Sequence, residues 1–148
     1  MTEVMFGSAE VTAVRQVWLS RHRKSAGSAR RLLRDFLAGL GGGEPYGFVG
    51  ELVVCELVTN AVQHARTSPG RLILVRFELL CDVLRIEVHD ASSKLPTVCP
   101  PSGADQEAGR GLWLVEQLSA RWGCGPREGG IGKLVWAEVA AAPGARGE

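Results

Sequence analysis

The segment that most constrains what this chain can fold into is Glu56-Leu57-Val58-Thr59-Asn60-Ala61-Val62-Gln63-His64-Ala65. Glu56, Asn60 and His64 recur every four residues, so on a helix they lie on one face, about one turn apart. Inside an otherwise apolar segment, each such group costs free energy unless it is paired. A carboxylate and an amide in line can hold a hydrated divalent cation and position a water or hydroxyl, which indicates a magnesium–nucleotide site. The same spacing also fits a satisfied polar stripe on an amphipathic helix, and the segment alone does not decide between the two.

Length and charge restrict the class of protein. The chain has 148 residues, enough for one domain with a core that needs neither disulfides nor metal. We expect this domain at residues 14–139, between a flexible N-terminus at 1–13 and a flexible tail at 140–148. The net charge of +1 argues against a general nucleic-acid or membrane surface, and the four cysteines lack zinc or CxxC spacing. With no signal-peptide pattern and no long apolar run, we expect a cytoplasmic protein.

The rest of the chain alternates between strand and helix patterns. Apolar residues at every second position predict strands, and apolar residues three and four apart predict helices. Ser25 or Ser28 can cap the first helix, and Gly39 with the glycines at 41–43 ends it. The predicted strands are residues 14–19, 71–80, 83–89, 121–124 and 134–139, and the predicted helices are residues 25–37, 46–65 and 109–118.

Two further groups of residues point to a nucleotide. Gly109-Arg110-Gly111-Leu112 opens the third predicted helix. Glycines there let the backbone approach a ligand, the free amides favour phosphate oxygens, and Arg110 adds charge. Asp90 ends a predicted strand, where a carboxylate can accept a hydrogen bond from an exocyclic amine such as that of adenine. A glycine pair at a helix start and an aspartate at a strand end are both also typical of plain turns, so neither group is decisive by itself.

Four segments in this order resemble the GHKL ATP-binding superfamily, and more closely the small anti-sigma-factor serine kinases of actinobacteria. They are ELVTNAVQHA at 56–65, VHDASSKLP at 88–96, GRGLWLVEQLSARWG at 109–123 and GKLVWAEV at 132–139. The resemblance covers nearly the whole predicted domain. It implies an α/β fold, a two-layer sandwich of the Bergerat type. A mixed, mostly antiparallel sheet would be covered on one face by about three helices.

The resemblance also implies roles on the central helix. Asn60 would coordinate the Mg²⁺ that bridges the phosphates of ATP. Glu56 would be the general base that orients or deprotonates the attacking hydroxyl or water. His64 lies on the same face, where we expect it to pack or to bond to the backbone.

By the same resemblance, ATP itself would be held by the segments after this helix. Asp90 would read the adenine amino group, and residues 97–108 would form the lid over the nucleotide. The other residues implied to line the base and the phosphates are Ser92, Pro96, Gly109, Arg110, Gly111 and Leu112. The family often carries a threonine after the Gly-Lys of the closing strand, where it helps to hold adenine. Here that position is Leu134, so we expect one polar contact to adenine to be missing.

The implied function is that of an anti-sigma regulatory factor with serine/threonine kinase activity. Such a protein binds a sigma factor, or binds a small STAS-type anti-sigma-factor antagonist and phosphorylates a serine on it; many dimerise. Trp18 with the basic residues at 21–34 is a candidate partner surface, although those arginines also fit plain exposed helix positions. The alternative is a non-catalytic module of the same fold, either ATP-gated or independent of nucleotide. On either interpretation we expect no direct nucleic-acid or membrane partner.

Overall fold

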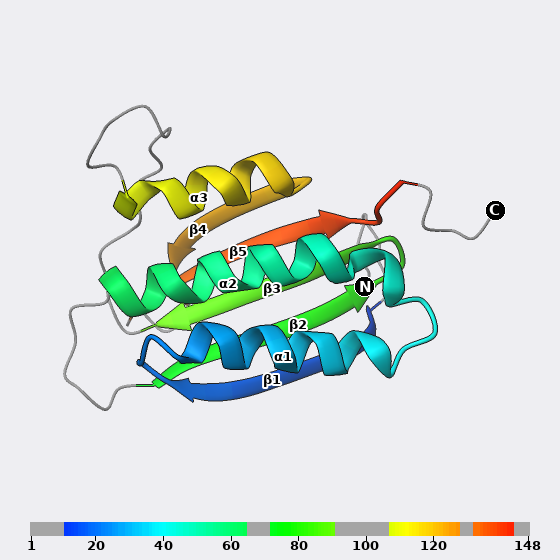
Figure 1. Cartoon of the computed structure of the whole chain (residues 1–148), viewed down its shortest axis with the longest axis horizontal. Helices are drawn as coiled ribbons and strands as arrows, with labels where there is room; N and C mark the ends of the chain where they lie inside the picture. Colours follow the sequence, from blue (N-terminus) through cyan, green and yellow to red (C-terminus); the bar gives the residue numbers. More distant parts are fainter. Residues whose placement is uncertain (1–10, 65–71, 91–106, 128–131, 144–148) are drawn as a thin grey trace, which may run out of the picture.

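The computed structural model describes residues 11–64, 72–90, 107–127 and 132–143 (Figure 1). Its strands run in the order β1-β2-β3-β5-β4, and the short 3₁₀ helix η2 precedes the central helix. The strands are β1 (Val11–Ser20), β2 (Leu72–Leu80), β3 (Val83–Asp90), β4 (Arg121–Pro126) and β5 (Lys133–Ala140). The helices are α1 (Ser25–Ala38), η2 (Glu44–Tyr46), α2 (Gly47–His64) and α3 (Glu107–Leu118).

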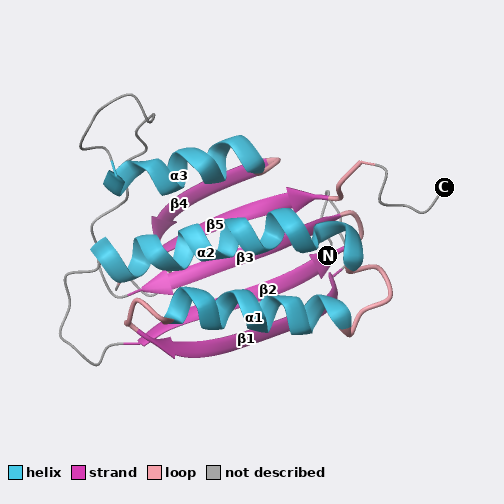
Figure 2. Cartoon of the chain, viewed as in Figure 1, coloured by secondary structure: helices cyan, strands magenta, loops and turns pink. Residues whose placement is uncertain are grey.

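The three α-helices lie side by side on one face of the sheet, with α2 between α1 and α3 (Figure 2). The predicted α/β two-layer sandwich is therefore confirmed. The expectation of a mixed sheet is wrong for the described strands, because all four pairings are antiparallel. β4 runs in the same direction as β3, but β5 lies between them, so the two never pair as parallel neighbours. None of the helices in the described ranges is long and apolar enough to cross a membrane.

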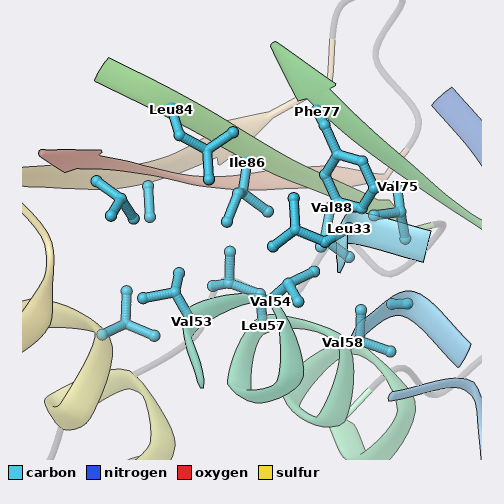
Figure 3. Close-up of a cluster of buried hydrophobic side chains, with 14 of the residues drawn as sticks. Leu33, Val53, Val54, Leu57, Val58, Val75, Phe77, Leu84, Ile86 and Val88 are labelled. Carbon is cyan, nitrogen blue, oxygen red and sulfur yellow. The ribbon is translucent and has the colours of Figure 1, made fainter. Parts of the chain in front are cut away.

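The core lies between the helices and the sheet face that they cover (Figure 3). Successive side chains of a strand point to opposite faces, and β3 follows this rule, with every second residue buried. In Figure 3, Val53 and Leu57 of α2 face Ile86 of β3, and Phe77 of β2 lies beside Leu33 of α1. The buried side chains of β3 are Leu84, Ile86, Val88 and Asp90. The same alternation places the Asp90 carboxylate on the core face, at the last residue of β3.

The start of α1 differs from the expected serine cap. Lys24 is the cap residue, and its side chain makes no capping hydrogen bond. Ser25 is the first residue of the helix, and its buried hydroxyl donates a 2.6 Å hydrogen bond to the Ser20 carbonyl at the end of β1. The hydroxyl of Ser28 donates backward to the Lys24 carbonyl. Both serines therefore bond to the backbone that precedes them, so neither is free to cap. The end of α1 at Gly39 is as predicted.

Among the residues that the structure describes, no helix covers the other sheet face, and this face carries paired charges. Glu87 accepts a 3.0 Å hydrogen bond from His89 and a 2.7 Å hydrogen bond from Arg85. The Arg85 guanidinium also lies 4.4 Å from the centroid of the Trp136 ring, within range of a cation–π interaction. The hydrogen bonds from His89 and then Arg85 hold the pKa of Glu87 at about 2, below its ordinary value of 4.5. Glu87 therefore stabilises the folded state above pH 4.5, and this contribution is lost as the pH falls towards 2.

We expect Glu87→Gln to lower the free energy of unfolding at pH 7 by about 2 kcal/mol, after allowance for solvent screening. Near pH 2 the difference from the unchanged protein should become small, because Glu87 is then protonated in the unfolded state and about half protonated in the folded state. Urea titrations at the two pH values measure it. Glu116→Gln is the matched control, since Glu116 is exposed on α3. An equal loss at both pH values would rule out the ionic origin of the effect.

Trp18 and the α1 arginines of the candidate partner surface lie on opposite faces of the sheet. Val17 and Leu19 pack against the core, so Trp18 between them points to the open face, where it is 54% exposed. Arg30 and Arg34 are on α1, which covers the other face. Trp18 and these arginines therefore cannot form a single contact surface.

Candidate functional site

The central helix brings the first two predicted residues together as expected. Glu56 and Asn60 are one turn apart on α2, and the helix continues to His64, whose side chain lies outside the described part of the structure. Asn60 is only 6% exposed, and its Nδ2 has no hydrogen-bond partner within the described ranges. A buried polar atom without a partner is costly, so one end of this amide is available for a ligand. A half-turn of the amide exchanges its oxygen and nitrogen, so that either can face the ligand.

The Glu56 carboxylate lies against α3. A Cβ atom placed on Gly111 would fall 2.5 Å from Glu56 Oε1, so a side chain at this position would require the Glu56 carboxylate to move. Burial raises the pKa of Glu56 above its ordinary value of 4.5. A carboxylate whose pKa is shifted towards neutrality is better suited to accept a proton from a hydroxyl. The geometry and the pKa direction thus agree with the expected role of a general base.

The third helix begins earlier than predicted, at Glu107 rather than at Gly109. Gly109 lies in the first turn, where backbone amides have no partner within the helix and can face an anion. Gly111 lies in the second turn, so its special role is the close approach to Glu56 rather than a free amide. Leu112 is 1% exposed and belongs to the hydrophobic core. Only the backbone of Arg110 is described, and Ser92, Pro96 and the predicted lid lie outside the described residues.

We expect Gly111→Ala to lower the reaction rate without lowering the stability of the fold. The clashing atom is the free end of a flexible side chain, so Glu56 should swing aside while α2 and α3 stay in place. If Glu56 is the base that the resemblance implies, its displacement should slow the formation of ADP in the presence of a phosphoryl acceptor by on the order of 100-fold, with a melting temperature close to that of the unchanged protein. ADP formation in the presence of the acceptor, together with a thermal melt, measures both. Normal ADP formation would show that this contact does not position Glu56.

Asp90 meets a lysine at the end of the β3–β5 ladder. Asp90 pairs directly with Lys133, and both side chains are buried under the helices at 2% and 0% exposure. The distance from Lys133 Nζ to Asp90 Oδ2 is 3.6 Å. A buried carboxylate beside a cation is an acceptor for hydrogen bonds, which fits the expected reading of an amino group.

The residue of β5 that lies beside Asp90 is not the one predicted. Leu134 pairs with His89 on the open face of the sheet, opposite to the side that Asp90 faces. Because side chains alternate along β5, the residue that meets Asp90 is Lys133. The predicted strand began at Leu134, one residue after the start of β5 in the structure. When the strand is extended back to Lys133, the alternation of its side chains places Lys133 on the buried face, and this is the signal that would have identified it. A threonine at position 134 would also face away from Asp90, so the expected loss of a contact there is wrong.

Comparison with known proteins identifies the class. The model of the histidine kinase-like ATPase domain family matches residues 19–137. This chain belongs to the histidine kinase-like ATPase domain family. Membership in a family of ATPase domains implies ATP binding in general. No curated protein matches the chain significantly.

Solved structures show the same fold. One is the structure of the RsbU and RsbW domains of Rv1364c from Mycobacterium tuberculosis, with a TM-score of 0.64 and 21% identity. The match covers 88% of this chain and 33% of that chain, so this protein spans about a third of its length. At this identity the likeness establishes the fold alone. The histidine kinase domain of a blue-light activated histidine kinase from Erythrobacter litoralis EL346 matches more loosely. Its TM-score is 0.49 at 20% identity, covering 82% of this chain and 61% of that chain.

Proposed function

We propose that this protein binds Mg–ATP beside α2 and α3 and transfers the γ-phosphoryl group to a serine or threonine of a protein partner. The observation that carries the proposal is the pair on α2: a buried Asn60 amide with an unpartnered end, one turn from the Glu56 carboxylate, whose pKa is raised. If the polar residues of α2 had only a structural role, their buried polar atoms would have hydrogen-bond partners within the protein. The unpartnered Asn60 amide therefore supports a ligand site over a purely structural polar stripe.

Each side chain near α2 has a task in this proposal. Asn60 would hold Mg²⁺ through its amide oxygen, together with the phosphate oxygens. When bound, the cation neutralises charge on the phosphates. Asp90 would accept a hydrogen bond from the adenine amino group. The remaining residues proposed to line the nucleotide are Ser92, Pro96, Gly109, Arg110 and Gly111, whereas the side chain of Leu112 lies in the hydrophobic core.

The chemistry that we propose for Glu56 is proton transfer. The partner hydroxyl donates its proton to the Glu56 carboxylate while its oxygen forms a bond to the γ-phosphorus. The bond from that phosphorus to the bridging oxygen breaks, and ADP leaves with the electron pair. The raised pKa of Glu56 supports this role, because it makes the carboxylate a better base near neutral pH.

We further propose that the partners are a sigma factor and a STAS-type antagonist of anti-sigma factors, so that the protein acts as an anti-sigma regulatory factor. The order of the four sequence segments supports this assignment, and the domain would extend over residues 14–139. A homodimer is part of the same proposal. The second candidate function is a protein-binding module without kinase activity. The Lys133 ammonium beside Asp90 favours it, since that carboxylate is already engaged.

Calorimetric titration with Mg–ATP tests the nucleotide site. We expect saturable binding that weakens strongly when EDTA removes the metal. Labelled γ-phosphate from ATP should then appear on a STAS-type protein mixed with the kinase. If the protein fails to bind ATP up to millimolar concentrations, the second candidate function replaces the first. Binding without any labelled partner would retain the nucleotide site and remove the kinase reaction.

A further inference from the structure

The proposed adenine-reading carboxylate is buried beside a lysine of this chain. Asp90 is 2% exposed and Lys133 is 0% exposed, and the two lie on the same face of the β3–β5 ladder as a directly opposed pair. Nζ of Lys133 is 3.6 Å from Asp90 Oδ2. In this arrangement Asp90 offers almost no accessible surface to a ligand. Some displacement must therefore accompany any hydrogen bond from a base to Asp90.

Lys133 and the adenine amino group offer Asp90 the same kind of contact. An ammonium carries three N–H donors and an exocyclic amine carries two, and both are complementary to a carboxylate, which only accepts. The lysine donor has the advantage of its charge, which strengthens the interaction with a carboxylate in a buried setting. The pair distance is longer than that of a short charge-assisted hydrogen bond, so the contact can still be broken.

The backbone fixes Lys133 in this place. Gly132, the residue before it, has φ of 91°, a conformation that side-chain-bearing residues rarely adopt. Its carbonyl accepts a 3.0 Å hydrogen bond from the Arg127 amide, which closes the β4–β5 turn. Lys133 is therefore the first residue of β5, with its side chain directed under the helices rather than to the open face.

We propose that Lys133 sets the affinity of this protein for ATP by competing with the adenine amino group for Asp90. The inference rests on the proposed nucleotide site and adds a determinant of its affinity. The apparent affinity of a site falls in proportion to the fraction of molecules that are competent to bind. If about one molecule in ten has Asp90 released, ATP binds roughly tenfold more weakly than it would to an open site.

The test is calorimetric titration of Mg–ATP against the unchanged protein and three variants. Lys133→Thr removes the competing ammonium and should bind ATP roughly tenfold more tightly. Lys133→Gln keeps the length but offers only a neutral donor, so its affinity should lie between the two. Lys24→Thr makes the same change of charge at an exposed site at the start of α1, and its affinity should equal that of the unchanged protein.

The outcomes separate this inference from the proposed function. Tighter binding by Lys133→Thr supports the inference, including the case in which the unchanged protein binds too weakly to detect. Equal or weaker binding by Lys133→Thr, with ATP still bound by the unchanged protein, overturns the inference and leaves the nucleotide site standing. No binding by any of these proteins overturns both. If Lys133→Thr does not fold, as a thermal melt would show, Lys133→Gln decides by the same criteria.

Discussion

Asn60→Ala should abolish Mg–ATP binding, with the dissociation constant rising by at least about 100-fold. The buried amide of Asn60 has an end without a partner in the described structure, and an alanine offers neither the oxygen nor the nitrogen that a metal or phosphate could meet. A lost contact to a charged ligand in a buried site costs about 3 kcal/mol, which corresponds to a factor of about 100. Calorimetric titration measures the loss directly.

Two controls make the Asn60 result specific. Gln63→Ala removes an amide of the same chemistry from the exposed side of the same helix, and ATP binding should be unchanged. Asn60→Asp retains an oxygen ligand for the cation and should keep part of the affinity. Full binding by Asn60→Ala would show that the buried amide has a purely structural role, and the α2 segment would then be a plain polar stripe.

Glu56→Gln should remove phosphoryl transfer and leave binding nearly intact. A glutamine has almost the same shape as glutamate and cannot accept the hydroxyl proton. General-base catalysis contributes about 10²- to 10⁴-fold to the rate, and we expect a loss in that range. ADP formation in the presence of the STAS-type protein as phosphoryl acceptor measures the rate, and calorimetry measures the affinity.

The pH dependence and a matched variant complete this test. Because burial raises the pKa of Glu56, the activity of the unchanged protein should fall as acidification protonates the base, beginning above pH 4.5. Glu116→Gln neutralises an exposed carboxylate on α3 and should transfer phosphate at the normal rate. A Glu56→Gln variant with normal ADP formation would exclude this carboxylate as the base.

The elements could be predicted because their hydrophobic patterns are strong. Along β3, Leu84, Ile86 and Val88 alternate with polar residues, and the structure buries these three side chains as a strand should. On α2, Asn60 follows Glu56 by one turn, so the sequence spacing alone brings the two onto one helix face. In both cases the relevant geometry is local, and a short segment contains it.

The contacts between elements could not be predicted in the same way. The resemblance points to Leu134, the residue after Gly-Lys, but a step of one residue along a strand reverses the face of the side chain, and the pairing of β3 with β5 places Lys133 beside Asp90. The contact of Gly111 with Glu56 depends on how closely two helices pack, which no spacing within one helix contains. The roles of Ser92 and Pro96, which lie outside the described residues, remain predictions.

The strand order β1-β2-β3-β5-β4 has a consequence for how this protein acquires its function during folding. Asp90 and Lys133 are distant in the chain and meet only when β5 pairs with β3. Contacts between distant residues require the closure of a long loop, which carries an entropic cost and slows folding. The α1–α2 pair and the β2–β3 hairpin are local by comparison. Competence to recognise a base therefore arises with a long-range pairing rather than with a hairpin, so a chain without β5 in place lacks this half of the site.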